Sequence, residues 1–271
     1  MCGICGCGQP ETRHAHGHGH EHGHAHGHGH EHSHGGGAGG LATRTVAVEA
    51  ELLAHNDELA GHNRQHFAAS GTLALNLVSS PGAGKTTLLE RTLADLGGEA
   101  PFAVIEGDQQ TDNDARRIAR TGVPVTQITT GQACHLDADM VHRALHGLPP
   151  LAPGSILMIE NVGNLVCPSL FDLGERCKVV VASVTEGEDK PEKYPYMFRA
   201  ARIVLLNKMD LLPYLNFDAA RFKELARRVN PGLKILSLSA TTGEGMGAWY
   251  DWLREERRAG LDALPEHASP G

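Results

Sequence analysis

A glycine-rich segment that ends in a lysine and two threonines is the strongest chemical signal in this sequence of 271 residues. It reads Ser-Ser-Pro-Gly-Ala-Gly-Lys-Thr-Thr over residues 79–87 and lies between an apolar run and a helical pattern, the setting that a phosphate-binding loop requires. We expect its backbone amides to hold phosphates, Lys85 to reach the β- and γ-phosphates as a catalytic residue, and the Thr86 hydroxyl to ligate Mg²⁺. The predicted contacts are Gly82, Ala83, Gly84, Lys85, Thr86 and Thr87. The usual first glycine is Ser79 here, and a plain strand-to-helix turn is the alternative.

A second motif, Asn-Lys-Met-Asp at residues 207–210, directly follows another apolar run and could select the base. Guanine carries a ring N–H beside an exocyclic amine, so that one carboxylate, Asp210, can accept both hydrogen bonds. Asn207 can face the other base edge, and the stem of Lys208 can lie on the purine. Adenine offers no such pair of donors, and a buried carboxylate left unpaired discriminates strongly. We therefore expect GTP and GDP rather than ATP, although the tetrapeptide alone could be a surface turn.

A third element of the base site is the segment that begins with Ser239 and Ala240, after the apolar run 235–238. We expect the amide of Ala240 to lie near the guanine carbonyl.

Two acidic residues are candidates for the magnesium site. Glu160 ends the apolar run 156–159, the usual place of the carboxylate that assists a phosphate loop, and Gly163 could sense the γ-phosphate through its amide. Asp108 follows the run 102–105 and is the other candidate, for Mg²⁺ or for the attacking water as a catalytic residue. Either could instead be a solvated loop acid. Because no arginine is an evident finger, we expect slow hydrolysis without a partner or dimerisation.

The N-terminal segment contains two kinds of metal ligand. Cys2, Cys5 and Cys7 place three thiols within six residues, a set that suits zinc, nickel or copper(I), and the amine of Cys2 could be a fourth ligand if Met1 is removed. Residues 14–34 carry a histidine at every even position, eleven in all. Such a tract should hold several divalent ions loosely and release them as the pH falls through the imidazole pKa of about 6.5. A redox or unused cysteine cluster and a low-complexity or tag-like tail are the alternatives.

A third group of ligands lies inside the chain. Cys134 and His135 follow the apolar run 123–128, and Cys167 lies shortly after the run 156–159. If both runs are parallel strands, these loops meet at one edge of the sheet and the three side chains could converge, leaving one position open for water or a second subunit. Cys177 has the pattern of a small core residue. His142 and His146 share a helix face, and we interpret them as surface residues.

An α/β scaffold must position these residues. Seven continuous apolar runs, at 73–78, 102–105, 123–128, 156–159, 179–184, 203–206 and 235–238, alternate with helical patterns at 86–96, 112–121, 136–146, 218–229 and 246–258. Continuous runs are typical of strands buried on both faces, so we predict a three-layer P-loop NTPase fold with a mostly parallel sheet between helices. A further helix is expected over 45–69, with Val46, Leu52, Leu53, Leu59 and Phe67 roughly on one stripe.

Composition sets the domain plan and the compartment. Residues 1–40 lack the apolar residues of a core, so we expect a disordered metal-binding tail there and one GTPase domain over 41–271, with an N-terminal helix at 41–71. The net charge of -8 argues against binding to nucleic acid or an anionic membrane surface. The sequence contains no run of about twenty apolar residues, so we expect no membrane-spanning helix. Without an export segment we expect the cytoplasm, where cysteines are thiols or ligands.

Together these motifs resemble the HypB family of hydrogenase nickel-incorporation GTPases, in the SIMIBI class of P-loop proteins, over nearly the whole chain. The resemblance rests on the cysteine cluster, the histidine tract, the phosphate loop, Glu-Gly-Asp-Gln-Gln, Cys-His-Leu-Asp, Glu-Asn-Val-Gly-Asn-Leu-Val-Cys-Pro and Asn-Lys-Met-Asp. It implies a GTPase of low intrinsic rate that dimerises with GTP and delivers nickel to the [NiFe]-hydrogenase large-subunit precursor. An accessory nickel/zinc protein of the HypA type is the implied companion. It also implies a nickel or zinc site at the subunit interface, formed by Cys134, His135 and Cys167.

Two other interpretations compete with this one. The urease accessory GTPases, UreG, share the core but usually show Cys-Pro-His where this chain has Cys134-His135, and they lack the N-terminal cysteine cluster. A nickel storage protein with a vestigial nucleotide core belongs to a different class. The intact Lys85, Thr86 and Asp210 argue against that reading, while the histidine tract could still store nickel in addition.

Overall fold

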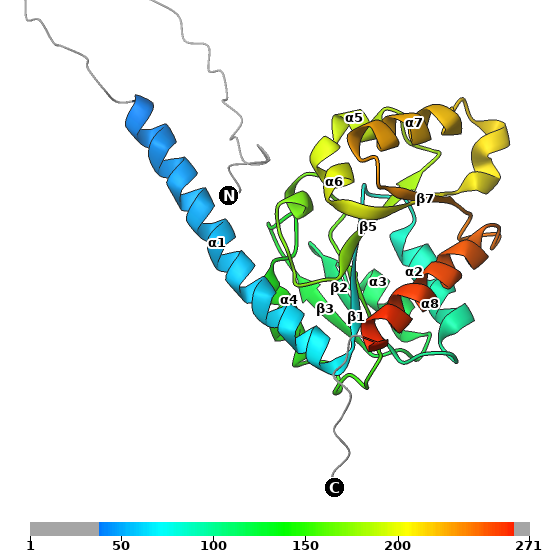
Figure 1. Ribbon diagram of the computed structural model, residues 1–271, viewed down its shortest axis with the longest axis horizontal. Helices are drawn as coiled ribbons and strands as arrows, with labels where there is room; N and C mark the ends of the chain where they lie inside the picture. Colours follow the sequence, from blue (N-terminus) through cyan, green and yellow to red (C-terminus); the bar gives the residue numbers. More distant parts are fainter. Residues whose placement is uncertain (1–37, 263–271) are drawn as a thin grey trace, which may run out of the picture.

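A seven-stranded sheet, with helices on both faces, organises residues 38–262, which are the residues that this computed structural model describes (Figure 1). Side chains are described for residue 48 and for residues 50–262. The expected tail of residues 1–40, with Cys2, Cys5, Cys7 and the histidine tract, lies outside the described residues except for 38–40, which begin the first helix.

All seven predicted strands are confirmed, and they form a single sheet. The strands are β1 (Leu73–Ser79), β2 (Phe102–Asp108), β3 (Val125–Thr129), β4 (Ile156–Glu160), β5 (Cys177–Ser183), β6 (Ala201–Asn207) and β7 (Lys234–Ser237). Their spatial order is β3-β2-β4-β1-β5-β6-β7, and every neighbouring pair is parallel. The carboxyl ends of all the strands therefore lie at one edge, where open α/β sheets bind their ligands.

Helices connect the strands. They are α1 (Ala38–Ser70), α2 (Lys85–Leu96), α3 (Asn113–Ala119), α4 (Ala138–Leu145), α5 (Lys190–Lys193), α6 (Pro195–Ala200), α7 (Ala219–Val229) and α8 (Met246–Asp262), with 3₁₀ turns η1 (Cys167–Ser169) and η2 (Met209–Tyr214). The short α5 and α6 were not predicted, since Pro191 and Pro195 interrupt the segment and neither helix is long enough to show a period. Among the described helices none is both long and apolar enough to cross a membrane.

The core divides into two sides because strand side chains alternate between the sheet faces. Leu75 and Leu77 of β1 pack on the side of α2 and α8, where Trp249 is fully buried. Ala74, between them, belongs to the opposite cluster, which α1 and α4 cover with Phe67 and other apolar side chains. The strands are thus buried on both faces, as their continuous apolar sequences predict.

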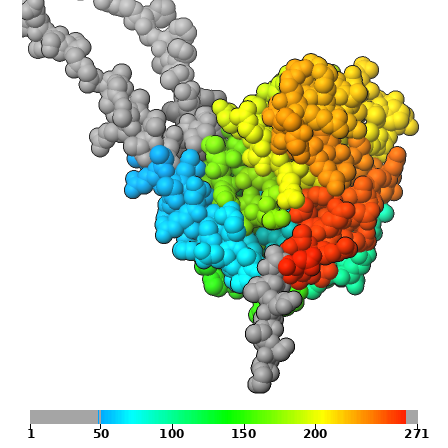
Figure 2. All heavy atoms as spheres, viewed as in Figure 1, coloured from blue at the N-terminus to red at the C-terminus, as the bar shows by residue number. Residues whose placement is uncertain are grey.

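The first helix differs from its predicted apolar stripe. Phe67 is buried, but Leu52 is 61% exposed, so that part of the prediction is wrong. The N-terminal half of α1 extends past the edge of the domain (Figure 1), and the coloured residues from about 50 onward form one flank of the molecule (Figure 2). The face that does pack on the domain carries the buried Asn56, Ala60 and Asn63, so two of the residues that dock this helix are polar.

Candidate nucleotide and metal site

The glycine-rich loop lies between β1 and α2 and lines a cavity of about 540 Å³ at the carboxyl edge of the sheet. Gly82 and Gly84 adopt left-handed backbone angles, with φ of +74° and +96°, which other residues rarely adopt. A Cβ atom on Gly84 would also come within 2.6 Å of the Asn207 side-chain nitrogen. The loop therefore needs glycine for its conformation and for its contact with the base-binding motif.

The charged and hydroxyl groups of the loop point into the same cavity. Lys85 is 9% exposed, and its Nζ donates a hydrogen bond to Ser79 Oγ over 3.0 Å. The Thr86 hydroxyl donates to Glu160 Oε1 over 2.8 Å. Ser79, where the usual pattern has glycine, thus supplies a hydrogen-bond partner to the loop lysine. Thr87 lines the cavity as well.

The residues of the base motif converge on the loop from β6. Asn207 is buried; its side-chain nitrogen donates to the Ala83 carbonyl, and its oxygen accepts from the Ala240 amide, both over 3.0 Å. The Ala240 amide, which was expected near the guanine carbonyl, is therefore directed at Asn207. Ser239 Oγ donates to Asp210 Oδ1 over 2.5 Å, which orients the carboxylate.

Lys208 joins the base motif to the phosphate loop. Its Nζ donates to the Gly82 carbonyl over 2.7 Å, and its φ of 61° is the one positive value among the described residues other than glycine. Such backbone strain is kept only where the surrounding contacts fix it, and it is often found at binding sites. Here the left-handed turn carries the lysine stem back over the loop.

A buried acid, Glu160, lines the phosphate side of the cavity, and a second, Glu106, lies next to it. Burial raises the pKa of Glu160, while Lys85 and the Thr86 hydroxyl oppose that rise. Glu106 lies opposite Glu160 on the neighbouring strand, and burial together with the Glu160 charge raises its pKa to about 8. Oε2 of both glutamates lacks a hydrogen-bond partner among the described residues. Two buried carboxylates beside a threonine hydroxyl suit a hard divalent cation such as Mg²⁺.

Asp108 has a different environment at the end of β2. It lines the same cavity, and its Oδ1 accepts hydrogen bonds from the amides of Gln110 and Thr111, each over 2.8 Å. Burial alone would raise its pKa, but these two hydrogen bonds lower it. Asp108 is therefore an ionised carboxylate that lines the cavity, whereas Glu160 contacts the loop threonine directly.

Three possible metal ligands meet beside this cavity. The ligand atoms of Cys134, His135 and Cys167 all lie within 4.8 Å of one another. The two sulfur atoms are 2.8 Å apart, and His135 Nδ1 lies 3.9 Å from the Cys134 sulfur. The His135 ring stacks on Phe171 with centroids 3.8 Å apart, and burial lowers its pKa. Two sulfurs and a neutral imidazole suit nickel or zinc.

One segment connects the phosphate side to these ligands. Gly163 packs on the loop, since a Cβ there would come within 3.2 Å of Pro81. Asn164 donates to the Cys134 carbonyl over 3.2 Å, and Cys167 begins the turn η1. The segment that starts at Glu160 therefore contacts the phosphate loop first and provides a metal ligand at its other end.

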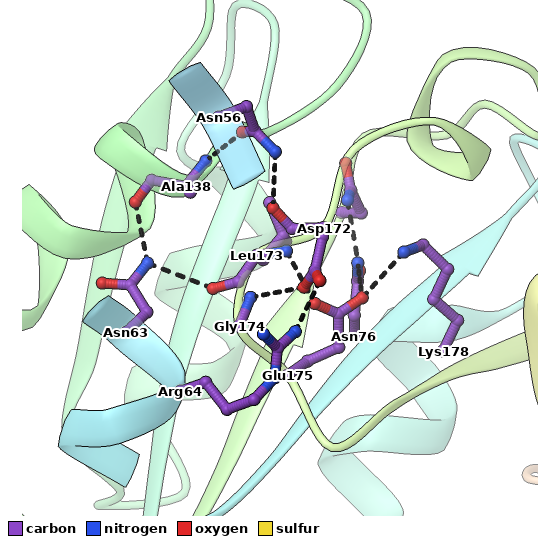
Figure 3. A network of polar contacts seen from close by, with 11 residues as sticks. Asn56, Asn63, Arg64, Asn76, Ala138, Asp172, Leu173, Gly174, Glu175 and Lys178 are labelled. Atoms are coloured by element: carbon purple, nitrogen blue, oxygen red, sulfur yellow. Dashed lines mark hydrogen bonds and ion pairs between the residues drawn. The ribbon is translucent and has the colours of Figure 1, made fainter. Parts of the chain in front are cut away.

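The helix α1 holds both ligand-bearing loops through buried asparagines (Figure 3). Asn56 accepts from the Ala138 amide over 2.9 Å and donates to the Asp172 carbonyl over 2.8 Å. Asn63 donates to the carbonyls of Ala138 and Leu173, over 2.9 and 3.1 Å. Ala138 lies just after the Cys134-His135 pair and Asp172 just after η1, so α1 holds the two loops at a fixed separation.

A second set of bonds in the same network reaches the strands. Asn76 of β1 donates to Glu175, which also accepts from Lys178, over 3.2 and 2.9 Å. Asn161 donates to Asn76 over 3.1 Å (Figure 3 shows the Asn76 end of this chain). Sequence analysis missed Glu106, Asn161 and the two α1 asparagines. Only the position of Glu106 beside Asp108, in an otherwise apolar strand, was a usable signal.

The other sequence expectations fall elsewhere. Cys177 lies on β5, where burial raises the pKa of its thiol to about 12, so it stays protonated and suits the predicted core role. His142 and His146 are exposed on α4. The ligands Cys2, Cys5 and Cys7 lie outside the described residues.

Comparison with known proteins identifies the family. The family described as CobW/HypB/UreG, nucleotide-binding domain, matches residues 73–237. The hydrogenase maturation factor HypB of Escherichia coli K12 is 59% identical over 216 residues, covering 80% of this chain and 74% of that protein. HypB of Azotobacter vinelandii is 56% identical over 230 residues, covering 83% and 76%. The crystal structure of Helicobacter pylori HypB in complex with nickel has a TM-score of 0.71 and 39% identity, covering 79% and 99%.

Proposed function

This chain belongs to the hydrogenase maturation factors HypB, within the CobW/HypB/UreG nucleotide-binding family, and from that premise we propose that it hydrolyses GTP to control nickel delivery. The acceptor is the large subunit of a [NiFe]-hydrogenase. The observation that carries the proposal is the continuous segment from Glu160 to Cys167, which contacts the phosphate loop through Thr86 and supplies a metal ligand at its far end.

Guanine selectivity is supported by the arrangement around Asp210. The Ser239 hydroxyl holds this carboxylate, and Asn207 is fixed between two backbone groups. A held carboxylate accepts the paired donors of guanine without reorganising, and it would be left unpaired by adenine. Lys208 would lie along the purine and hold the base end against the loop.

Magnesium fits the phosphate side of the cavity. Thr86 and Glu160 would hold the ion, with Asp108 and Glu106 adding negative charge nearby. When bound, Mg²⁺ neutralises charge that develops on the phosphates. The chain itself would contribute the loop amides and Lys85, which bind and orient the β- and γ-phosphates, while Asp108 is placed to position the attacking water. The rate should be low in the isolated chain, because Arg117 is the one arginine of residues 38–262 that lines this cavity, and it is ion-paired with Glu90.

Nickel is the cargo that we assign to Cys134, His135 and Cys167. Thiolate and imidazole ligands suit nickel and zinc, and three ligands leave a position open for transfer. Cys2, Cys5 and Cys7 would form a second, N-terminal nickel site. The histidine tract would hold further ions as a store.

Dimerisation through the metal face is supported by exposed apolar residues that flank Cys167. Val166 and Leu170, on either side of η1, are 39% and 37% exposed. A second copy that covers this face would remove apolar surface from water and would bring a second set of ligands to the open position. We infer that GTP favours this dimer, since Gly163 and the residues that follow connect the phosphates to that face.

The proposed cycle follows from this arrangement. With GTP and Mg²⁺ bound, the Asp108 loop and the segment 160–163 would be held in place, and two subunits would associate. Loss of the γ-phosphate releases the segment, the dimer loosens, and nickel passes to its acceptor. An accessory nickel/zinc protein of the HypA type would assist this transfer. Reduced thiols are needed as ligands, which suits the cytoplasm.

The test is nickel binding to the full-length chain in two nucleotide states. Nickel affinity and assembly state are measured with GDP and with a non-hydrolysable GTP analogue, both with Mg²⁺. We expect the analogue to change the affinity of the thiolate site and to increase the dimer fraction. The Cys167→Ser variant should lose the nucleotide dependence of nickel binding.

Cys177→Ser is the matched control, because Cys177 is a protonated thiol on β5, outside the ligand group. It should keep the wild-type response. Identical nickel affinity and identical assembly state in both nucleotide forms would overturn the proposal.

A further inference from the structure

Three histidines from two helices surround one cavity away from the nucleotide. His66 of α1, His142 of α4 and His146, which directly follows α4, line a hollow of about 420 Å³. We propose that His142 and His146, with His66 at the side of the same cavity, form a further binding site for a borderline divalent cation, nickel or zinc. The inference rests on the proposed nickel-handling function and adds a site to it.

The hydrogen bonds of Asn63 fix which nitrogen of His142 carries a proton. The side-chain amide of Asn63 is fully buried, and its nitrogen faces the carbonyls of Ala138 and Leu173, which can only accept. Its oxygen must therefore be the atom that faces His142 Nδ1, over 3.2 Å, and in the neutral ring that nitrogen is the donor. The Nε2 atom of His142 then carries the lone pair that a metal requires.

This arrangement is the usual support for a metal-bound imidazole. Histidine ligands commonly donate the second ring N–H to a carboxylate or a carbonyl oxygen, which fixes the tautomer and the ring orientation. Here the supporting oxygen belongs to a residue that is itself held by two further hydrogen bonds. His142 is thus fixed in orientation even though it is an exposed residue.

The position of His146 completes a pair. Residues four apart lie on the same helix face, and the two ring centroids are 5.2 Å apart with an interplanar angle of 87°. With metal–nitrogen bonds of about 2.1 Å, two rings that share one tetrahedral ion have centroids about 5 Å apart. The centroid separation of the pair therefore matches that of two imidazoles bound to one ion.

Among the described residues, no lysine or arginine lines the cavity. The titratable groups that line it, among the described residues, are the three histidines alone. Arg143, the nearest basic residue on α4, is ion-paired with Asp139 over 2.8 Å. Two imidazoles leave coordination positions open for water, so the ion should exchange readily.

The location suggests what such a site is for. The helix α1 continues the chain from the histidine-rich residues 14–34 and presents His66 to the cavity. Asn63, which supports His142, also bonds to the loops that carry Cys134 and Cys167. An ion held here would lie on the body of the protein, in a site separate from both the N-terminal ligands and the thiolate centre.

The test is peptide-resolved labelling of histidines in the full-length chain. Diethyl pyrocarbonate modifies an imidazole nitrogen only when its lone pair is free, and mass spectrometry separates the α4 peptide from the N-terminal tract. With Ni²⁺ at about ten times the Kd of the proposed histidine site, we expect modification of His142 and His146 to slow about tenfold. In the His146→Gln variant, the protection of His142 should be lost, because the shared ion has lost a ligand.

The control and the contrary outcomes are built into the same experiment. His62→Gln changes an exposed histidine of α1 that does not line the cavity and should leave the protection intact. Unprotected His142 and His146 beside a protected His135 would overturn this site and leave the proposed function standing. Protection of His142 that survives His146→Gln would also overturn it. Loss of protection at His135 as well would count against both proposals.

Discussion

The side-chain oxygen of Asn161 accepts a hydrogen bond from the backbone amide of Leu136 over 3.1 Å. Asn161 directly follows Glu160, and Leu136 directly follows His135, so this bond joins the magnesium side of the cavity to the metal-ligand loop. The same oxygen also accepts from the Val162 amide over 3.0 Å. Asn161 is 1% exposed, which leaves no water to replace these contacts.

We therefore predict that Asn161→Ala uncouples the two sites. The ratio of nickel affinities between the GTP-analogue and GDP forms should fall toward one, since the Leu136 loop loses its direct tie to the nucleotide segment. The variant should also lose about 1–3 kcal/mol of unfolding free energy, because a buried amide is left unpaired. Nickel titration in both forms and denaturant unfolding check the two effects.

Asn230→Ala is the matched control for this variant. Asn230 donates to the carbonyls of Phe198 and Ala201, and among the described residues it makes no hydrogen bond to the segment from Glu160 to Cys167 or to the Cys134 loop, so its loss should cost stability without breaking that connection. It should leave the nickel ratio unchanged. An Asn161→Ala protein that retains the wild-type ratio would exclude Asn161 as the coupling residue.

Asp210→Asn should change the preferred base. The amide nitrogen would face the guanine donors and repel them, so we expect GTP affinity to fall about 10–100-fold, equivalent to about 1.4–2.7 kcal/mol. Xanthine carries a carbonyl where guanine has its amine, so xanthosine triphosphate should bind the variant better than GTP does. Equilibrium binding of GTP and xanthosine triphosphate measures this change in base preference. If the variant binds GTP as tightly as the natural chain, Asp210 does not contact the base.

Glu106 makes the stability of the nucleotide-free protein depend on pH. Its folded pKa of about 8 exceeds the ordinary value of 4.5, so the folded protein keeps a proton that the unfolded chain releases. Stability from this group is fully present below about pH 4.5 and is lost as the pH rises to about 8, by at most about 1.4 kcal/mol per pH unit. Glu106→Gln should flatten that dependence and raise the melting temperature at pH 8. Unchanged slopes in thermal scans from pH 5 to 8 would contradict this account.

Asn56→Ala tests whether α1 positions the thiolate centre. Asn56 bridges the Ala138 amide and the Asp172 carbonyl, so its loss should let the two ligand loops separate. We expect weaker nickel binding and a changed nickel–thiolate absorption band, together with a loss of about 1–3 kcal/mol of stability. The control is Glu58→Ala, which changes an exposed residue of the same helix and should leave the absorption band unchanged. An unaltered band in the less stable Asn56→Ala protein would limit α1 to a purely structural role.

Sequence alone predicted the strands and the loop because their signals are local. Continuous apolar runs identify strands buried on both faces, and the glycines around Lys85 identify a phosphate loop wherever they occur between a strand and a helix. The convergence of Cys134, His135 and Cys167 needed the order of the strands, which places β2 between β3 and β4. Spacing in the sequence could suggest that proximity without fixing it.

The docking of α1 could not be predicted in this way. Asn56 and Asn63 are polar residues, and polar residues on a helix normally indicate its solvent face. They are buried because backbone groups of distant loops provide their partners, and those loops are between 75 and 116 residues away along the chain. Leu52 is exposed for the complementary reason, because its half of the helix extends past the domain.

The short segment between Glu160 and Cys167 should also transmit an effect from the metal site to the nucleotide site. Linkage is mutual: if the triphosphate alters how firmly an ion is held, then the ion must alter, by the same factor, how firmly the triphosphate is held. A metal ion bound to the sulfur atoms of Cys134 and Cys167 would restrain the end of β4, where Glu160 faces Thr86. A loaded chain and an empty chain should then retain their nucleotides differently, so the protein would sense whether it is carrying anything before it commits to a round of hydrolysis.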